Sequence, residues 1–134
     1  MKMSSKARYG LYVAVELAKN YDSGAVVNVA SLSQTTGVTE KYLEQIIALM
    51  KKADIVESLR GASGGYKLTD SPENVSVGRI LRAVEDNLEI VDCLHADCAN
   101  SGKCVARSLW GKLYDNINGY LDTISLKQLA EDNI

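Results

Sequence analysis

Residues 28–50 read NVASLSQTTGVTEKYLEQIIALM, and this stretch decides the fold. Asn28 and Thr39 are good N-cap residue types, and each stands before a run with apolar residues at helical spacing. Gly37 separates the two runs and suits the left-handed position that ends a helix. Two short helices joined by such a tight turn predict a helix-turn-helix.

A β-hairpin is predicted directly after these two helices. Residues 54–59 alternate in part, a glycine-rich turn follows at 60–65, and a second extended run occupies 66–69. Pro72, the only proline, closes this part of the chain. A hairpin attached to a helix-turn-helix is a wing, so residues 1–72 are expected to form a winged helix-turn-helix DNA-binding domain.

The rest of the chain is predicted to be helical apart from residues 87–104, which show no helical or strand period and contain the cysteines; this stretch is called the cysteine segment. The helix expected over 105–121 carries more apolar surface than a solitary surface helix exposes, so we expect it to pair with a second copy of the chain. The predicted fold class is therefore mainly α with a β-hairpin wing, and residues 73–134 are expected to hold the cysteine segment and the dimerisation helices. The other expected elements are a helix over 6–21 capped by Ser4 or Ser5, a short extended piece at 25–27, a helix from Ser76 to about Asp86, and a last short helix from Ser125.

Composition places the chain among ordinary soluble proteins. Of its 134 residues, 46% are hydrophobic and 24% charged, and no run approaches the roughly 18 apolar residues needed to span a membrane. The start of the sequence lacks the features of a signal peptide, so we expect a cytoplasmic protein with no membrane partner. Residues 1–70 carry a charge of +2 and residues 71–134 a charge of −4, which suits an anion-binding face in the first half. A single histidine and no credible base–nucleophile pair argue against an enzyme.

All three cysteines, Cys93, Cys98 and Cys104, fall within twelve residues. In the cytoplasm, clustered cysteines in an odd number are poor candidates for structural disulfides. Thiolates select iron–sulfur clusters, zinc or copper(I), and gaps of four and five residues with no second pair fit zinc poorly. The spacing therefore favours an iron–sulfur cluster, either 2Fe-2S or 4Fe-4S, with His95 as a further candidate ligand. Two alternatives stay open, namely small apolar residues in a loop and a thiol redox sensor without metal.

The candidate DNA-binding residues lie at the start of the second helix of the helix-turn-helix and on the wing. In the major groove, first-turn side chains and the helix N-terminus meet phosphates and base edges. Gln45 can pair with adenine and Glu44 can accept from a cytosine amino group, while arginine suits a narrow minor groove. The alternative is that these are only solvated polar positions. The candidates for binding double-stranded DNA are Thr39, Lys41, Tyr42, Glu44, Gln45, Arg60 and Gly61.

Several motifs together resemble the Rrf2 family of bacterial transcription regulators, and most of all its iron–sulfur cluster regulator group. The motifs cover nearly the whole chain and occur in the family's order. They are Lys6-Ala7-Arg8-Tyr9, Tyr42-Leu43-Glu44-Gln45, Arg60-Gly61-Ala62-Ser63-Gly64-Gly65-Tyr66, and the three cysteines followed by Leu109-Trp110.

The resemblance implies a dimeric winged-helix repressor in which a long helix near the C-terminus pairs the subunits and a cluster on the cysteines modulates DNA binding. It implies that Glu44 helps to choose between classes of DNA site. The family places a histidine ligand three residues after the third cysteine, where this chain has Arg107, and another branch uses an acidic residue near the partner's first helix, where this chain has Arg8. The alternatives are a family member without a cluster, controlled by a protein partner or by thiol oxidation, and an iron–sulfur enzyme or electron carrier.

Overall fold

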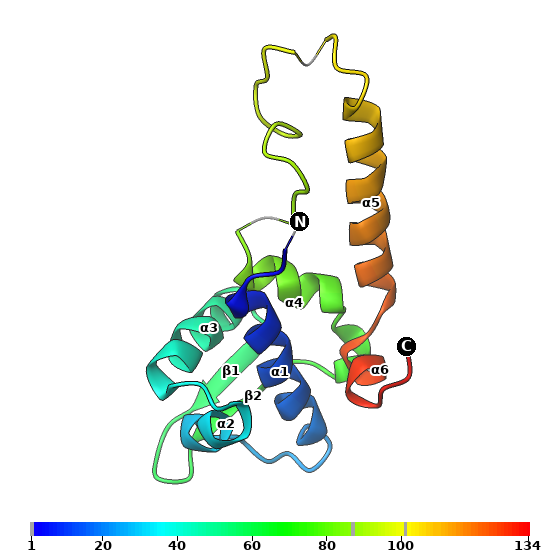
Figure 1. The fold of residues 1–134 in the computed structure, drawn as a ribbon. Helices are drawn as coiled ribbons and strands as arrows, with labels where there is room; N and C mark the ends of the chain where they lie inside the picture. Colours follow the sequence, from blue (N-terminus) through cyan, green and yellow to red (C-terminus); the bar gives the residue numbers. More distant parts are fainter. Residues whose placement is uncertain (1, 87, 101) are drawn as a thin grey trace.

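The computed structural model describes residues 2–86, 88–100 and 102–134. Helices dominate the fold, and the two strands form one antiparallel hairpin (Figure 1), which confirms the predicted fold class. In chain order the elements are α1 (Ser5–Lys19), α2 (Val29–Thr36), α3 (Glu40–Lys52), β1 (Val56–Leu59), β2 (Gly65–Leu68), the 3₁₀ helix η1 (Pro72–Asn74), α4 (Val77–Val84), α5 (Arg107–Thr123) and α6 (Leu126–Ala130).

Side-chain caps begin the helices of the helix-turn-helix where the sequence predicts them. The side chain of Asn28 accepts from the Ser31 amide at 2.8 Å, and that of Thr39 accepts from the Tyr42 amide at 3.3 Å. Gly37 ends α2 with a φ of 74°, a left-handed conformation that costs little without a Cβ. These three residues set the turn between α2 and α3 by local chemistry alone.

One hydrophobic core joins α1 and α3 to α4 and α6. Close packing of α1 on α4 depends on Gly10, since a Cβ built there would lie 3.1 Å from a methyl of Val84. The chain returns to this core after α5, because the Leu126 amide donates to the carbonyl of Val75 at 2.7 Å and the Leu126 side chain is fully buried. The core is therefore formed jointly by the expected DNA-binding part, residues 1–72, and by residues that follow it.

The hairpin is braced by the extended segment that precedes α2. Its register runs from Val56 opposite Leu68 to Leu59 opposite Gly65. Val27 pairs with Tyr66, each amide donating to the other residue's carbonyl at 2.9 and 2.8 Å. The predicted extended piece thus pairs with β2 through a short bridge and attaches the wing to the helices.

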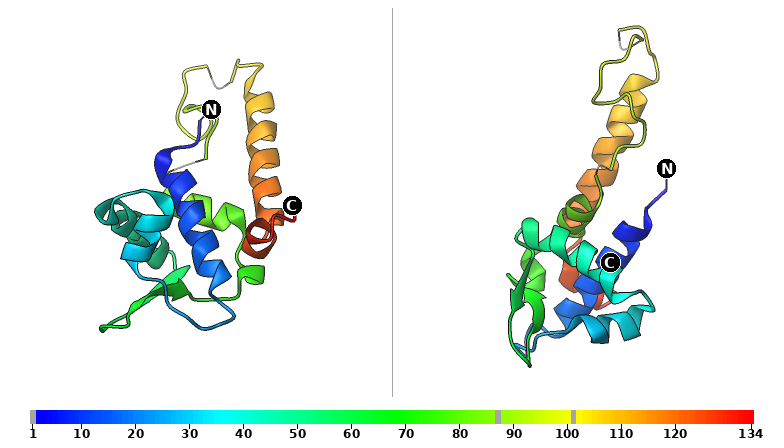
Figure 2. Two further views of the ribbon diagram at one scale, coloured as in Figure 1. Left: turned by 60° about the horizontal axis from the view of Figure 1, so that its bottom comes forward. Right: turned by 90° about the vertical axis from the view of Figure 1, so that its left-hand side faces the viewer.

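Helix α5 leaves the body as an arm, and the cysteine segment runs beside it in both the front and the side view (Figures 1 and 2). No residue of α5 is buried. At its base, the guanidinium of Arg82 binds the carboxylate of Asp122 and donates to Asn118 Oδ1 at 3.2 Å. Every helix in the described part of the chain is too short or too polar to span a bilayer.

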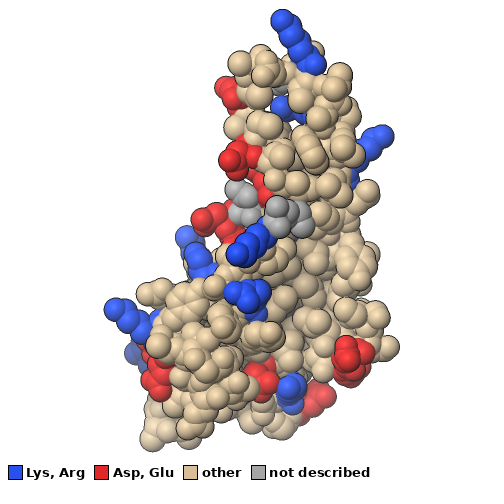
Figure 3. Space-filling model, in the orientation of Figure 1, with Lys and Arg blue, Asp and Glu red and all other residues tan. Residues whose placement is uncertain are grey.

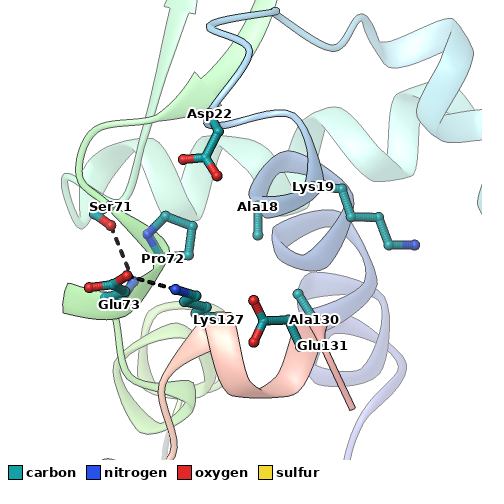
Figure 4. A pocket seen from close by; sticks show the side chains of 9 residues that line it. All are labelled: Ala18, Lys19, Asp22, Ser71, Pro72, Glu73, Lys127, Ala130 and Glu131. Carbon is teal, nitrogen blue, oxygen red and sulfur yellow. Dashed lines mark hydrogen bonds and ion pairs between the residues drawn. The ribbon is translucent and has the colours of Figure 1, made fainter. Parts of the chain in front are cut away.

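Helix α6 is fixed to η1 by an ion pair at the edge of a shallow pocket of about 230 Å³ (Figure 4). The ammonium of Lys127 lies 2.8 Å from a carboxylate oxygen of Glu73. Hydrogen bonding and attraction from Lys127 lower the pKa of Glu73, and the same pair raises the pKa of Lys127. Asp22 and Glu131 also line this pocket, so its charges are of both signs.

Candidate DNA-binding surface and cysteine segment

The buried stripe of α3 determines which of its side chains face solvent. Because this stripe packs into the core, the candidates Thr39, Lys41, Glu44 and Gln45 are all exposed. They lie at the N-cap and in the first two turns, where the helix also presents unpaired backbone N–H groups. The buried stripe consists of Leu43, Ile46, Ile47 and Met50.

Tyr42 differs from the other α3 candidates because it is half-buried. Its ring meets the ring of Tyr9 edge-on, with 6.4 Å between the centroids, and the guanidinium of Arg8 lies 5.9 Å from the Tyr9 centroid. Tyr9 therefore fixes the tyrosine of α3 from α1. The sequence signal for this support was the tyrosine in Lys6-Ala7-Arg8-Tyr9, to which sequence reasoning gave no role.

The wing presents Arg60 and Gly61 to solvent. Gly61 has a φ of 113° and open space around its missing side chain, whereas a Cβ on Gly64 would lie 2.2 Å from the carbonyl oxygen of Leu59. Gly64 is thus required by the turn itself, and Gly61 leaves backbone open to a ligand. Sequence reasoning did not distinguish these two roles.

A hydrogen bond links the end of α3 to the wing. The ammonium of Lys51 donates to Ser58 Oγ on β1 at 3.0 Å. Figures 1 and 2 show α3 and the hairpin at the same end of the molecule, away from the free end of α5. Acidic and basic side chains are interspersed on the face drawn in Figure 3, so this face carries no large patch of one sign. The described cations on α3 and the wing are Lys41, Lys51, Lys52, Arg60 and Lys67, of which Lys67 pairs with Glu57 at 3.3 Å.

The three cysteines are free thiols on the segment beside α5. Cys93 and Cys104 are exposed and Cys98 is half-buried. Thiolates are the donors that iron–sulfur clusters take, so the chemistry of the set fits such a group. Among the described residues, however, no three His, Cys, Asp or Glu side chains gather into one metal-holding group.

His95 and Arg107 both have protein partners. His95 Nδ1 lies 2.5 Å from Glu89 Oε1, and its ring meets that of Tyr114 edge-on with 5.0 Å between the centroids. Arg107 donates to the carbonyl oxygens of Cys93 and Leu94. The position at which the resembled family carries a histidine ligand therefore holds a side chain that binds the backbone of the cysteine segment.

Three comparisons with known proteins agree with this architecture. The Rrf2 family model, described as an iron-dependent transcriptional regulator, matches residues 3–132. The HTH-type transcriptional regulator IscR of Photobacterium profundum is 34% identical over 134 residues, covering 99% of this chain and 77% of that protein. Two solved structures superpose with TM-scores of 0.80 at 34% identity.

The first is CymR, described as the global cysteine regulator of B. subtilis, and the match covers 98% of this chain and 97% of that one. The second is IscR of T. potens, in which it covers 100% of this chain and 89% of that one. The relatives IscR of Photobacterium profundum and CymR of Bacillus subtilis are both named as HTH-type transcriptional regulators, and neither is named as an enzyme. With a family match over nearly its whole length, this chain belongs to the Rrf2 family of transcriptional regulators.

Proposed function

We propose that this chain is a sequence-specific DNA-binding repressor whose affinity for DNA is modulated by an iron–sulfur cluster on Cys93, Cys98 and Cys104. The observation that carries the DNA role is the exposed polar row at the start of α3 beside an exposed wing arginine. Gln45 and Glu44 are assigned to base edges, Thr39, Lys41 and Tyr42 to phosphates, and Arg60 with Gly61 to the minor groove. Residues 1–72 would bind DNA, and residues 73–134 would sense and pair.

The proposed cluster would act on the DNA surface through α4 and α1. A bound cluster would supply a redox-sensitive, oxygen-labile group on the segment that holds it. That segment starts just after α4, where the Glu85 carboxylate accepts a hydrogen bond from the Ser4 hydroxyl at the start of α1. Because α1 supports α3 through Tyr9 and Tyr42, a shift at Glu85 can alter how α3 is presented. Cluster binding biases DNA affinity only to the extent that it favours one of these conformers.

Pairing of two copies through α5 completes the proposal. The helix presents Leu109, 58% exposed, and Tyr120, 60% exposed, with Leu113 between them. An apolar stripe of this kind on an arm without buried residues needs a partner. Two paired chains would place two α3 helices on two half-sites of the operator.

A metal-free thiol sensor is the second candidate, favoured by the exposure of Cys93 and Cys104 and by the likeness to the cysteine regulator CymR. Exposed thiols are accessible to oxidants, and oxidation would change the charge and shape of the same segment. A metal-free regulator could also take its signal from a protein partner instead of from thiol oxidation.

The test is to purify the protein without oxygen and to measure its absorbance spectrum and its iron and sulfide content. DNA binding is then measured by fluorescence anisotropy, at a stated salt concentration, on a duplex selected from a randomised library. The proposal expects iron and sulfide in the wild type, their loss in the Cys93→Ser/Cys98→Ser/Cys104→Ser variant, and different DNA affinities with and without the cluster.

The DNA role and the cluster role fail separately. Absence of iron and sulfide from the wild type would exclude the cluster and leave the thiol sensor. Failure of the protein to enrich any duplex would exclude the DNA role.

A further inference from the structure

The start of the cysteine segment is tied to the first turn of α5 by one arginine. Arg107 Nη1 donates to the carbonyl oxygen of Cys93 at 3.1 Å, and Nη2 donates to that of Leu94 at 2.9 Å. The guanidinium is a rigid fork with fixed donor directions, so two bonds from it to consecutive carbonyls set both the place and the orientation of that backbone. Arg107 itself lies three residues after Cys104, whose carbonyl accepts from its amide at 3.4 Å.

The two residues after Cys93 rest on the same helix. Leu94 is only 9% exposed, although its neighbours in the segment are exposed, and its Cδ1 lies 4.0 Å from where a Cβ of Gly111 would be. The ring of His95 lies edge-on to the ring of Tyr114 at 5.0 Å. The Leu94 side chain therefore lies against the turn of α5 that contains Gly111, at ordinary van der Waals distance.

The three receiving residues form one stripe of α5. Arg107, Gly111 and Tyr114 stand at positions i, i+4 and i+7, which share a helix face. At about 100° per residue, Leu109 and Leu113 lie on the nearly opposite face. Docking of the cysteine segment on one side therefore leaves the apolar side of α5 free.

We propose that Arg107, Gly111 and Tyr114 form a docking stripe for Cys93, Leu94 and His95, and that Arg107 is the positioning residue that fixes Cys93. The stripe holds the backbone of Cys93 by its carbonyl and leaves its thiol exposed. Its effect on metal retention rests on the proposed function, but the docking itself does not.

The docking is tested first in the reduced, metal-free protein by NMR with methyl-labelled leucine. We expect nuclear Overhauser contacts between the Leu94 methyls and Gly111 and between the rings of His95 and Tyr114. Arg107→Gln should weaken both contacts, and Gly111→Leu should abolish the first while leaving the arginine in place. Lys112→Gln, which removes an exposed cation from another face of the same helix, should change neither. Absent contacts in the wild type, or unchanged contacts in Arg107→Gln, would overturn the proposal.

The second readout is the rate at which the reconstituted protein loses iron in air. Arg107→Gln should lose iron about fivefold faster than the wild type, a size suited to charge-assisted hydrogen bonds that are partly open to solvent. Arg107→Lys, which keeps the charge but not the fork, should fall between them, and Lys112→Gln should match the wild type. Equal rates in Arg107→Gln and the wild type would overturn the positioning role. If the wild type takes up no iron, the cluster proposal fails while the NMR result still decides the docking.

Discussion

Single atoms decide several features of the wing and of the surface beside it. At Gly65 the space of a Cβ is taken by the carbonyl oxygen of Val27, which would lie only 2.7 Å away. This close approach allows the two hydrogen bonds between Val27 and Tyr66 that brace the hairpin. On α3, the half-buried Tyr42 packs against Tyr9. This contact fixes the first turn of α3, with its exposed side chains, relative to α1. Substitutions that add or remove only a few atoms at these positions should therefore change stability or DNA binding measurably.

Gly65→Ala should lower the free energy of unfolding by about 1–3 kcal/mol, because the added methyl must push the wing away from Val27. Chemical denaturation followed by circular dichroism measures this difference. Gly102→Ala is the matched control, since a Cβ there meets no atom within 4 Å. Equal stabilities of the two variants would contradict the brace.

Gln45→Ala should weaken binding to the selected duplex about tenfold and relax the preference at one base pair, because it removes a base-edge contact. Arg60→Ala should weaken binding more evenly across sequences if the arginine acts through groove width and phosphates. Fluorescence anisotropy on the selected duplex and its single-base variants separates the two patterns. Ser108→Ala, exposed on α5, is the control. Wild-type binding by both variants would mean that the DNA surface lies elsewhere.

At the scale of elements, local chemistry explains what the sequence could predict. Capping by Asn28 and Thr39, the glycine stop at Gly37 and the hairpin all depend on residues close in sequence. The structure has the caps and the stop at the predicted positions, and its strands, Val56–Leu59 and Gly65–Leu68, lie within one or two residues of the predicted bounds. The sequence predicts the long helix over 105–121, and the structure has it two residues later, at Arg107–Thr123. Its N-cap residue, Ala106, makes no side-chain capping bond that could have marked the start.

Contacts between distant segments were beyond sequence reasoning. The bridge from Val27 to Tyr66 and the return of Leu126 to the core join residues whose pairing leaves no periodic signal. The same holds for Arg107, whose spacing from Cys104 was visible but whose acceptors, the carbonyls of Cys93 and Leu94, were not. The candidate DNA residues could be found because they follow from helix position, and their roles stay predictions.

The ion pair between η1 and α6 should make stability depend on pH at the acid end. Lys127 lowers the pKa of Glu73 in the folded state, so the pair contributes stability above the ordinary carboxyl pKa of about 4 and loses it as pH falls through the lowered value. The raised pKa of Lys127 implies that the contribution is lost again when pH rises through that value. Urea unfolding measured from about pH 5 to pH 2 should show a smaller decline in Lys127→Gln than in the wild type.

Lys112→Gln serves as the control for this series because it removes an exposed lysine without breaking the pair. Its stability should fall with acid as steeply as that of the wild type. Parallel curves for Lys127→Gln and the wild type would show that the pair contributes nothing.

At the scale of the whole molecule, α5 differs from the other described helices because none of its residues is buried. Its body-facing contacts are concentrated at its base, where Arg82 binds Asp122 and Asn118. Along the arm, one face receives the cysteine segment and the opposite face presents Leu109 and Leu113. The shape therefore suits a molecule that is completed by a second copy.

Leu109→Glu combined with Leu113→Glu should convert the proposed dimer to a monomer, because burying two carboxylates in an apolar interface is strongly unfavourable. Analytical ultracentrifugation measures the mass, and circular dichroism should show an intact fold since neither residue belongs to the core. Ser108→Glu adds one charge about 100° away around the helix and should stay dimeric. A wild-type monomer, or a dimer in the double variant, would rule out pairing through this stripe.

Backbone hydrogen bonds join the segments that begin α4 and α6, although these helices are far apart in the sequence. The Val77 amide donates to the carbonyl of Ile124 and the Leu126 amide to that of Val75, so these bonds join α4 to the start of α6 across the base of the arm. Of the described residues from 88 to 121, only Leu88 lies in the core cluster and Leu121 packs against it. This stretch is in effect an insertion between two core elements, and the entropy of closing an insertion grows only slowly with its length. Its length and its complement of thiols can therefore change without disturbing the register of the core. The same helical core can therefore accommodate connecting segments with different sensing chemistry between α4 and α6.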